Sequence, residues 1–295
     1  MRTSTRKGSL KASLCQKVRY LNFLAQRSGG PVSVGTVAEA GLGSGFTPGE
    51  RVWCNSLGHG GRQGCCAERA VVAADRLYRL PVGADPLTAV AALHPAATAF
   101  LGLHHRARVC AGQTAFVGGG AGSVGSCAVQ FAKEAGLQVI ATARPGDHGR
   151  CRDLGADAVF DYDQPNLADR VLGVAPGGVD LLWDTSGHSQ LAAVAPMVAD
   201  GGQILITAGR EPQAPTRLWP LYTRDISVLG FVISLATSAE LADAARAINR
   251  RLAGPGFAIR IAGVLPLARI AEAHATVEEG RSRGRIVIRI EEEAG

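Results

Sequence analysis

Short β-rich runs alternate with helical patterns through the middle of this 295-residue chain, from about residue 113 to 235. Runs such as GQILITA (202–208) are apolar throughout, which is typical of strands buried on both faces of a sheet. This alternation predicts an α/β fold, in which a doubly wound parallel sheet carries helices on both faces. The expected strands are TAFVGG, LQVIATA, DAVFDY, VDLLWDTS, GQILITAG and ISVLGFVIS, and the expected helices are GSVGSCAVQFAKEAG, HGRCRDLGA, NLADRVLGVA and HSQLAAVAPMVAD.

Two β-rich stretches flank this βα core. Residues 32–82 contain short apolar runs between glycine-rich turns, and residues 257–290 show the pattern strand, helix, strand. We therefore expect two domains. One is β-rich and is assembled from both ends of the chain, residues 1–92 and 255–295, and the other is the βα core, residues 93–254.

The charge of the chain is mildly positive, with a formal net charge of +6. The arginines are scattered, and there are only 8 Phe, 4 Tyr and 3 Trp to stand beside them. A nucleic-acid platform usually combines positive charge with stacking aromatic side chains. We therefore expect no nucleic-acid partner, and the arginines are read as a solvated basic surface or as a site for an anionic ligand.

Targeting and compartment signals are weak. No apolar run approaches the roughly 20 residues that span a bilayer, so we expect no membrane segment. The basic first 30 residues lack the continuous apolar core of a secretory signal. The seven cysteines show neither a CxxC pair nor a repeating interval, which is typical of reduced thiols in a cytoplasmic protein.

A glycine-rich loop follows the first expected strand of the core. Residues 120–125, GAGSVG, fit the pattern GxGxxG between a strand and a helix. In that context glycines allow a tight turn and let a pyrophosphate approach the backbone, while the helix N-terminus offers free N–H groups to the phosphates. We predict a dinucleotide site with the pyrophosphate held at Gly119, Gly122, Ser123 and Val124; the alternative is a structural glycine turn.

The end of the second strand indicates which dinucleotide is bound. The strand ends at Thr142, Ala143 and Arg144, where a site that prefers NADH usually has an acidic residue for the ribose hydroxyls. Arg144, with Arg150 downstream, offers positive charge where a 2′-phosphate would lie. The sequence therefore favours NADPH as cofactor, and the alternative is that Arg144 is a solvated loop residue.

Several motifs in order resemble the zinc-independent quinone oxidoreductase branch of the medium-chain dehydrogenase/reductase superfamily, a zeta-crystallin-like group. The resemblance covers roughly residues 31–290. It rests on PGERVW, CAERAVVAADRLYRLP, AALHPAATAFLGL, GGAGSVGSCAVQFAKEAG, GADAVFDY, VDLLWDTSG, DGGQILITAG and LARIAEAHATVEEGRSRGRIVI.

The resemblance implies a GroES-like β-rich domain packed on a Rossmann domain, with hydride delivered from NADPH in the cleft between them. It also suggests a homodimer formed through ISVLGFVIS. The substrate would be a quinone, an enone or a similarly conjugated carbonyl. Further cofactor contacts are expected at or near the carboxyl ends of the core strands and in the segment that enters the Rossmann domain, at Thr98, Thr142, Asp184, Thr207, Gly209, Phe231 and Ile233.

The metal ligands of the zinc-dependent relatives have no counterpart. Where those relatives carry GHExxGxV, this chain has GPVSVGTV (30–37), so Pro31 and Val32 replace the histidine and the glutamate. The four closely spaced thiolates of a structural zinc lobe are also missing from the sequence. We therefore expect an enzyme without zinc, whose substrate accepts a hydride without help from a Lewis acid.

The amino-terminal region departs from the family pattern. Relatives have about thirty more residues here, including a segment GVNxxDxxxRxG, of which only VRYLNF and RSG are echoed. Asn22 is a candidate for the residue beside the nicotinamide, or else a surface residue of a disordered leader. We expect the missing strands to expose a sheet edge or to open the cleft.

The catalytic residue is not fixed by the sequence. Besides Asn22, the candidates are His59, in a loop expected to reach the cleft, and Tyr78. Weaker candidates for a proton donor are His94, His104, His105 and Tyr222. Two alternative functions stay open: the same fold used for a non-redox cyclisation or dehydration, and a basic module that binds nucleic acid or a protein partner.

Overall fold

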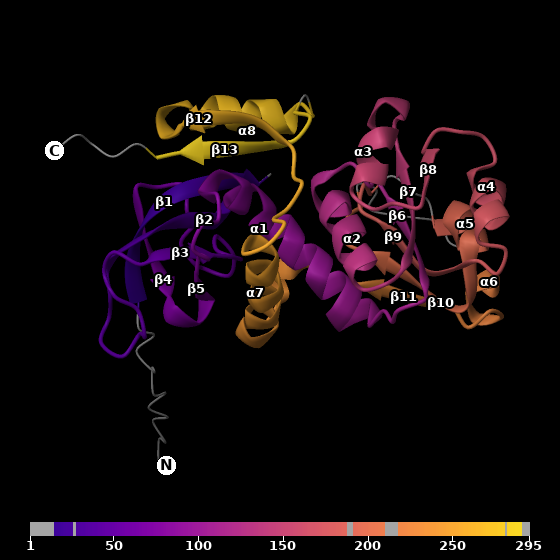
Figure 1. The fold of residues 1–295 in the computed structure, drawn as a ribbon, viewed down its shortest axis with the longest axis horizontal. Helices are drawn as coiled ribbons and strands as arrows, with labels where there is room; N and C mark the ends of the chain where they lie inside the picture. The colour runs from indigo at the N-terminus through magenta and orange to yellow at the C-terminus, as the bar shows by residue number, and fades with distance from the viewer. Residues whose placement is uncertain (1–14, 26–27, 188–190, 210–217, 281, 291–295) are drawn as a thin grey trace, which may run out of the picture.

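The computed structural model describes residues 15–25, 28–187, 191–209, 218–280 and 282–290; for 15–25, 28–30 and 191 it describes the backbone alone. Two sheets stand side by side along the long axis of the molecule, with helices α1 (Pro86–Phe100) and α7 (Ser238–Leu252) between them (Figure 1). The β-rich sheet combines strands from both ends of the chain, as the sequence pattern predicts.

The second sheet has six parallel strands in the order β11-β10-β9-β6-β7-β8. The chain moves outward from β6 in one direction and then from β9 in the other, so the strand order reverses between these two neighbours. The predicted α/β class with a doubly wound parallel sheet is therefore confirmed. The strands are β6 (Thr114–Gly118), β7 (Gln138–Ala143), β8 (Ala158–Asp161), β9 (Val179–Asp184), β10 (Val198–Ile206) and β11 (Ser227–Gly230).

Helices connect these strands and cover the sheet. They are α2 (Ser123–Glu134), α3 (His148–Asp153), α4 (Leu167–Val174), α5 (Leu191–Val194) and α6 (Trp219–Tyr222). Short 3₁₀ turns are η1 (Ala74–Arg76), η3 (Pro145–Asp147), η4 (Ala195–Met197), η5 (Ile233–Leu235) and η6 (Leu267–Arg269), and η2 (Leu101–Ala107) is a π-helical continuation of α1.

Two of the expected elements are shorter than predicted. The helix expected over HSQLAAVAPMVAD is wrong at its end, because η4 contains Pro196 and the chain enters strand β10 at Val198. Proline lacks the N–H that a continuing helix needs. The strand expected over ISVLGFVIS ends at Gly230, and Ile233 begins a 3₁₀ turn.

The β-rich sheet has seven strands, in the order β12-β13-β1-β2-β3-β5 with β4 paired to β1. Its elements are β1 (Cys15–Ala25), β2 (Ser28–Glu39), β3 (Arg51–Cys54), β4 (Arg69–Ala73), β5 (Leu77–Arg79), β12 (Ile261–Pro266), helix α8 (Ile270–Glu278) and β13 (Arg285–Arg289). Strand β1 lies between β13 and β2. Of the two alternatives expected for the shortened amino terminus, an exposed edge is not seen along β1, which is flanked by β13 and β2 with Asn22 opposite Ser33 and Ile288. An opened cleft stays a prediction.

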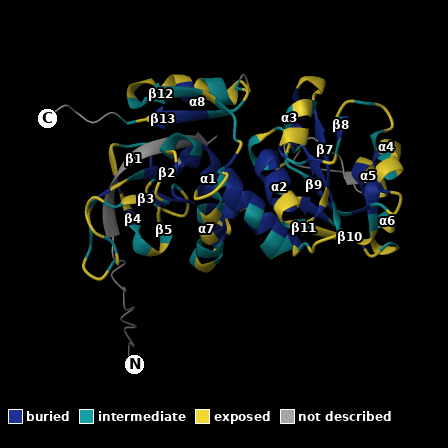
Figure 2. Cartoon of the chain, viewed as in Figure 1, coloured by how far each residue is buried: buried dark blue, intermediate teal, exposed yellow. Residues whose placement is uncertain are grey.

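Helix α1 joins the two halves of the molecule. The expected boundary at residue 92/93 falls within it, and its residues share one apolar cluster with Val32 and Trp53 of the β-rich sheet and with Val117 and Cys127 of the other half. Ten of its fifteen residues are buried, from Ala89 to Ala99, and α1 is dark blue in Figure 2.

The expectation that no apolar run approaches the length of a bilayer span is wrong for this helix. With η2, it forms 22 residues (Pro86–Ala107) that are long and apolar enough to cross a membrane, with a mean hydropathy of 1.4. However, 72% of the 18-residue stretch for which this mean is given is buried inside the protein, as in the core helix of a globular fold.

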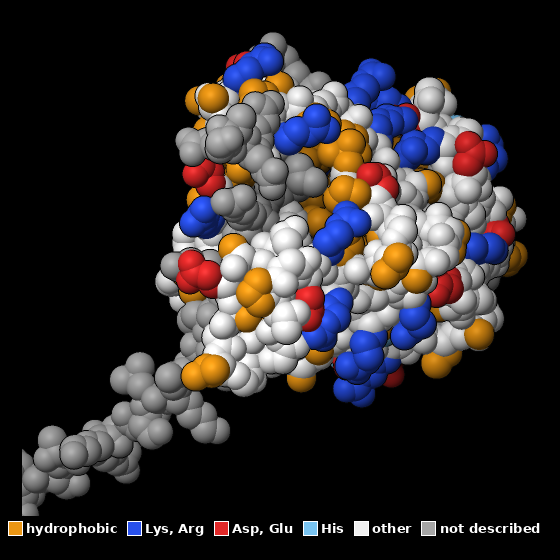
Figure 3. Space-filling view, turned by 60° about the vertical axis from the view of Figure 1, so that its left-hand side comes forward, with side chains coloured by type: hydrophobic (Ala, Val, Ile, Leu, Met, Phe, Trp, Pro, Cys, Tyr) orange, Lys and Arg blue, Asp and Glu red, His pale blue; other side chains and the backbone are white. Residues whose placement is uncertain are grey.

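Basic side chains do not form a continuous stripe on the face shown in Figure 3. Lys and Arg occur there in small groups, with Asp and Glu beside several of them. The structure contains ion pairs of this kind, such as Arg269 with Glu272 and Arg246 with Asp243.

Candidate functional site

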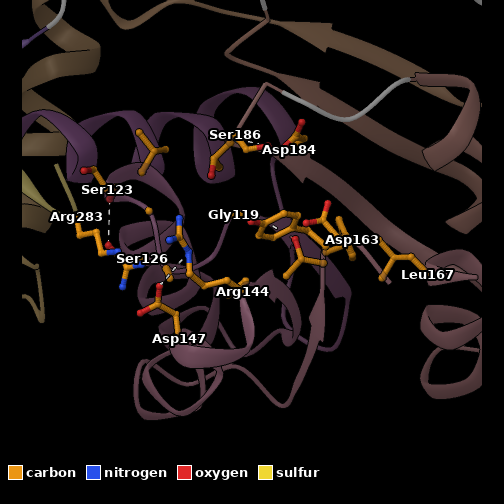
Figure 4. Close-up of a pocket in the computed structure, with 18 of the residues that line it drawn as sticks. Gly119, Ser123, Ser126, Arg144, Asp147, Asp163, Leu167, Asp184, Ser186 and Arg283 are labelled. Atoms are coloured by element: carbon orange, nitrogen blue, oxygen red, sulfur yellow. Dashed lines mark hydrogen bonds and ion pairs between the residues drawn. The ribbon is translucent and has the colours of Figure 1, made fainter. Parts of the chain in front are cut away.

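A cavity of about 1190 Å³ lies where the strands β6 to β9 end. It is lined on one side by the loops that follow these strands and on the other by residues 259–260, Gly280 and residues 282–284, with Arg283 beside Ser123 and Ser126 (Figure 4). A cavity at the carboxyl edge of a parallel sheet, beside the reversal of strand order, is the usual ligand position in this architecture.

The glycine-rich loop forms the floor of the cavity. Gly119 has a φ of +72°, a conformation that L side chains rarely adopt, and its N–H donates to Thr142 Oγ1 at 3.2 Å. A Cβ on Gly125 would lie 2.2 Å from the Gly119 carbonyl oxygen, so the helix can approach the loop only with glycine there.

Helix α2 begins at this loop with Gly122 as its N-cap, and no side chain caps it. The first-turn N–H groups and the positive end of the helix dipole therefore face the cavity. Ser123 and Val124 line the cavity at this point. The arrangement suits a pyrophosphate.

Hydroxyl groups and a carboxylate gather at the end of β9. Asp184 Oδ1 accepts hydrogen bonds from the Ser186 N–H (2.9 Å) and the Ser186 hydroxyl (2.6 Å), and the Thr185 hydroxyl donates to the Gly118 carbonyl at 2.7 Å. The bond from Thr185 ties the end of β9 to β6 at the point where the strand order reverses, and the two bonds from Ser186 order the turn that follows β9. Asp184 and Ser186 thus form a polar wall of the cavity, opposite Arg144 (Figure 4).

Three arginines surround one carboxylate at the other end. Asp147 accepts a hydrogen bond from Arg260 Nη2 at 2.7 Å and lies 3.8 Å from Arg144 Nε. The hydrogen bond from Arg260, together with the charges of Arg260, Arg144 and Arg283, holds the pKa of Asp147 below its usual range. One carboxylate among three guanidinium groups leaves a net positive charge, which suits an anionic ligand.

The predicted cofactor residues fall into two groups. Seven of them line the cavity: Gly119, Gly122, Ser123, Val124, Thr142, Arg144 and Asp184. The remaining six do not line it. Arg150 donates to the Ala258 carbonyl (2.8 Å), Thr98 to the His94 carbonyl (2.9 Å), and Thr207 accepts from the Trp183 indole (2.9 Å).

The last three of that group lie near β10 and β11. Gly209 is exposed, Ile233 is buried in the core, and the Phe231 ring packs under the Arg106 guanidinium at 5.6 Å.

The candidates for catalysis are dispersed, and none of those with described side chains lines the cavity. For Asn22 only the backbone is described. His59 is exposed in its loop, and the Tyr78 ring packs on Trp53 with 4.6 Å between ring centroids. Burial raises the pKa of the Tyr78 phenol, so it is a poor acid at neutral pH.

The weaker candidates for a proton donor do not line the cavity either. His94 Nδ1 is 3.3 Å from Asn55 Oδ1, and burial, with the charge of Arg285, lowers the pKa of His94 to about 3. His104 and His105 contact the Phe100 ring, and Tyr222 is exposed beside Trp219. Within the described residues, no group of three or more His, Cys, Asp or Glu is arranged to hold a metal ion.

Most residues that line the cavity were not predicted from the sequence. Arg260, Ser282 and Arg283 come from the C-terminal segment, and Asp147 sits three residues after Arg144. The run GRSRGR (280–285) is recognisably basic in the sequence. Its residues Gly280 and 282–284 reach the cavity only because the chain returns over the loop that follows β7. Further lining residues missed are Tyr162, Asp163, Asn166 and Leu167, which follow β8.

Comparison with known proteins agrees with this geometry. Residues 123–250 match the family model described as zinc-binding dehydrogenase. The quinone oxidoreductase of Sus scrofa is 30% identical over 251 residues, which cover 83% of this chain and 74% of that protein. Among solved structures, an alcohol dehydrogenase superfamily protein from Novosphingobium aromaticivorans has a TM-score of 0.85 at 27% identity, covering 98% of this chain and 95% of that one.

A third similar protein, an NAD-dependent alcohol dehydrogenase, has a TM-score of 0.78 at 25% identity, covering 94% of this chain and 92% of that one. The fold and the cavity define an oxidoreductase of the medium-chain dehydrogenase/reductase superfamily, with a GroES-like and a Rossmann half. Such enzymes use a nicotinamide dinucleotide. Within this superfamily, the chain belongs to the quinone oxidoreductase family.

Proposed function

We propose that this protein is a zinc-free, NADPH-dependent reductase of quinones, enones or similarly conjugated carbonyls. The observation that carries the choice of cofactor is the cluster of Arg144, Arg260 and Arg283 around Asp147 at one end of the cavity. A 2′-phosphate is the part of NADPH that NADH lacks, and guanidinium groups bind phosphate well.

The residues present fit the whole dinucleotide. The uncapped start of α2, at Ser123 and Val124, would hold the pyrophosphate, and the arginine cluster would hold the 2′-phosphate. Asp184 and Thr185, at the end of β9, would face the nicotinamide half. NADPH supplies the hydride when bound, and the protein contributes its orientation and the exclusion of water around it.

The absence of zinc is inferred from residue chemistry. Pro31 and Val32 are buried in β2, at the positions where the zinc-dependent relatives have histidine and glutamate. Neither side chain can donate an electron pair to a metal. A conjugated acceptor suits such a site, because its reduced product delocalises the negative charge that a metal would otherwise stabilise.

The first experiment is a fluorescence titration of the protein with NADPH and NADH, followed by addition of quinones and enones while nicotinamide absorbance is recorded. We expect NADPH to bind at least about tenfold more tightly than NADH, since hydrogen bonds to a charged group contribute roughly 1.5–3 kcal/mol. We also expect acceptor-dependent oxidation of NADPH.

Two variants test the arginine cluster in the same titration. Arg144→Gln and Arg283→Gln should each weaken NADPH binding about tenfold and leave NADH binding unchanged. Arg152→Gln, a control on the exposed side of α3 that does not line the cavity, should change neither. Equal binding of both cofactors would contradict the choice of NADPH, and binding without oxidation over a broad acceptor panel would point to a non-redox use of the fold.

A further inference from the structure

Several polar groups of the β-rich half have buried atoms without a hydrogen-bond partner among the described residues, and three of these groups lie on or beside the paired strands β3 and β5. These three are Arg62 Nη2, Arg76 Nη1 and the Tyr78 hydroxyl. Arg62 lies in the loop after β3, Arg76 ends the 3₁₀ turn η1, and Tyr78 lies in β5. A buried donor without a partner costs about 1–3 kcal/mol, so three in one region call for an explanation.

Local contacts hold two of the three groups, Arg62 and Tyr78, in place. Arg62 Nε donates to the Ser56 carbonyl at 3.1 Å, and Ser56 has a left-handed backbone with a φ of 58°. The Tyr78 ring packs on Trp53. Leu57 and Leu77 belong to one buried apolar cluster, which connects the loop of Arg62 to the strand of Tyr78.

Asp75 supplies one negative charge in this region, against the two guanidinium groups of Arg62 and Arg76. Asp75, which precedes Arg76, accepts a hydrogen bond from the Ser238 hydroxyl of α7 at 2.7 Å. Burial and then the charge of Arg76 lower the pKa of Arg62, so the two guanidinium groups repel one another. An anion between them would relieve that repulsion and give the buried N–H groups an acceptor.

We propose that Arg62, Arg76 and Tyr78 form a binding site for a small oxyanion, a carboxylate or a phosphate group. The guanidinium groups would bind two of its oxygens and the phenol would donate to a third. None of the three residues lines the cavity of the arginine cluster, so this site is separate from it. It lies where the two halves meet, because the Ser56 hydroxyl reaches the Ile233 carbonyl at 3.5 Å.

The first test measures binding of inorganic phosphate and of succinate by calorimetry. All variants carry Arg144→Gln and Arg283→Gln, so that the cavity cluster does not compete for the anion. We expect millimolar binding that Arg62→Gln and Arg76→Gln each weaken at least about tenfold. Tyr78→Phe, which keeps the ring on Trp53, should weaken it severalfold.

Arg69→Gln is the matched control, since it removes an exposed arginine from β4 of the same sheet. It should leave anion binding unchanged. If neither anion binds, or if Arg62→Gln, Arg76→Gln and the Arg69 control behave alike, the proposal is wrong. This test needs no NADPH and therefore does not depend on the proposed reductase activity.

The second test identifies the source of the oxyanion and does rest on the proposed function. The KM of a carboxylated naphthoquinone is compared with that of its uncharged parent, in the otherwise unmodified enzyme and in Arg76→Gln. A rise in KM of about tenfold for the carboxylated acceptor alone assigns the site to the substrate. Equal KM changes, combined with lost phosphate binding in the first test, assign it to a free anion.

Discussion

At the scale of single residues, the glycines of the phosphate loop make the sharpest prediction. Gly125→Ala would place a Cβ 2.2 Å from the Gly119 carbonyl oxygen, so α2 must move away from the loop. Overpacking of this kind typically costs about 1–3 kcal/mol. We expect Gly125→Ala to lower the free energy of unfolding by that amount and to weaken dinucleotide binding, as measured by urea denaturation and cofactor titration.

Gly173→Ala is the matched control, also a glycine within a helix. Nothing lies within 4 Å of the Cβ it would add in α4, so the variant should gain roughly 0.5–1 kcal/mol from better helix propensity. If both variants changed stability in the same direction, the close approach of Gly125 to Gly119 would not be the reason for glycine at that position.

The residues that line the cavity also show which parts of the site can be predicted from the sequence. Gly119, Ser123 and Arg144 were predictable because the loop, the helix start and the strand end are contiguous in sequence. Arg260 and Arg283 were not, because they reach Asp147 only when the chain returns from the β-rich half. No local pattern encodes that return.

At the scale of elements, the core strands were predictable because each is a short apolar run between glycine-rich turns. Strand β1 was not. Its residues carry several basic and polar side chains, and its place is set by pairing with β2, β4 and β13, which lie elsewhere in the chain. The structural role of residues 15–25 therefore depends on tertiary partners rather than on local periodicity.

Helix α7 carries a capping box that makes a prediction about pH. The Glu240 N–H donates to Thr237 Oγ1, and Glu240 also accepts from the Thr237 N–H and, at 2.6 Å, from Arg106 of η2. The hydrogen bond from Arg106 is the main reason why the pKa of Glu240 falls to about 2. A carboxylate with a lowered pKa stabilises the fold above its unfolded pKa of about 4.3, and this contribution is lost as pH falls toward 2.

We therefore expect Glu240→Gln to lower the free energy of unfolding by about 1–3 kcal/mol at pH 7. The difference from the unmodified protein should shrink as pH falls from about 4.3 to 2, in denaturation curves recorded at each pH. Glu272→Gln, which breaks the half-exposed ion pair with Arg269, should cost less than about 1 kcal/mol. A pH-independent difference for Glu240→Gln would refute the linkage.

At the scale of the whole molecule, the edge of the parallel sheet suggests how copies of the chain associate. Strand β11 pairs only with β10 among the described strands, and exposed apolar side chains lie on and beside it: Ile206 (41% exposed), Val228 (42%) and Val232 (50%). An exposed apolar edge strand is a template for pairing with another chain. We therefore predict a homodimer in which β11 strands of two copies extend one sheet.

Light scattering coupled to gel filtration should then give twice the 30.5 kDa mass of the chain. Val228→Lys places a charge on the edge and should shift the protein to monomer, because a buried unpaired ammonium group is costly at an interface. Val71→Lys, at a valine of equal exposure (43%) on β4 of the other sheet, should leave the dimer intact. A monomeric unmodified protein, or dissociation by both variants alike, would mean that β11 is not the interface, and its exposed valines would then need another partner.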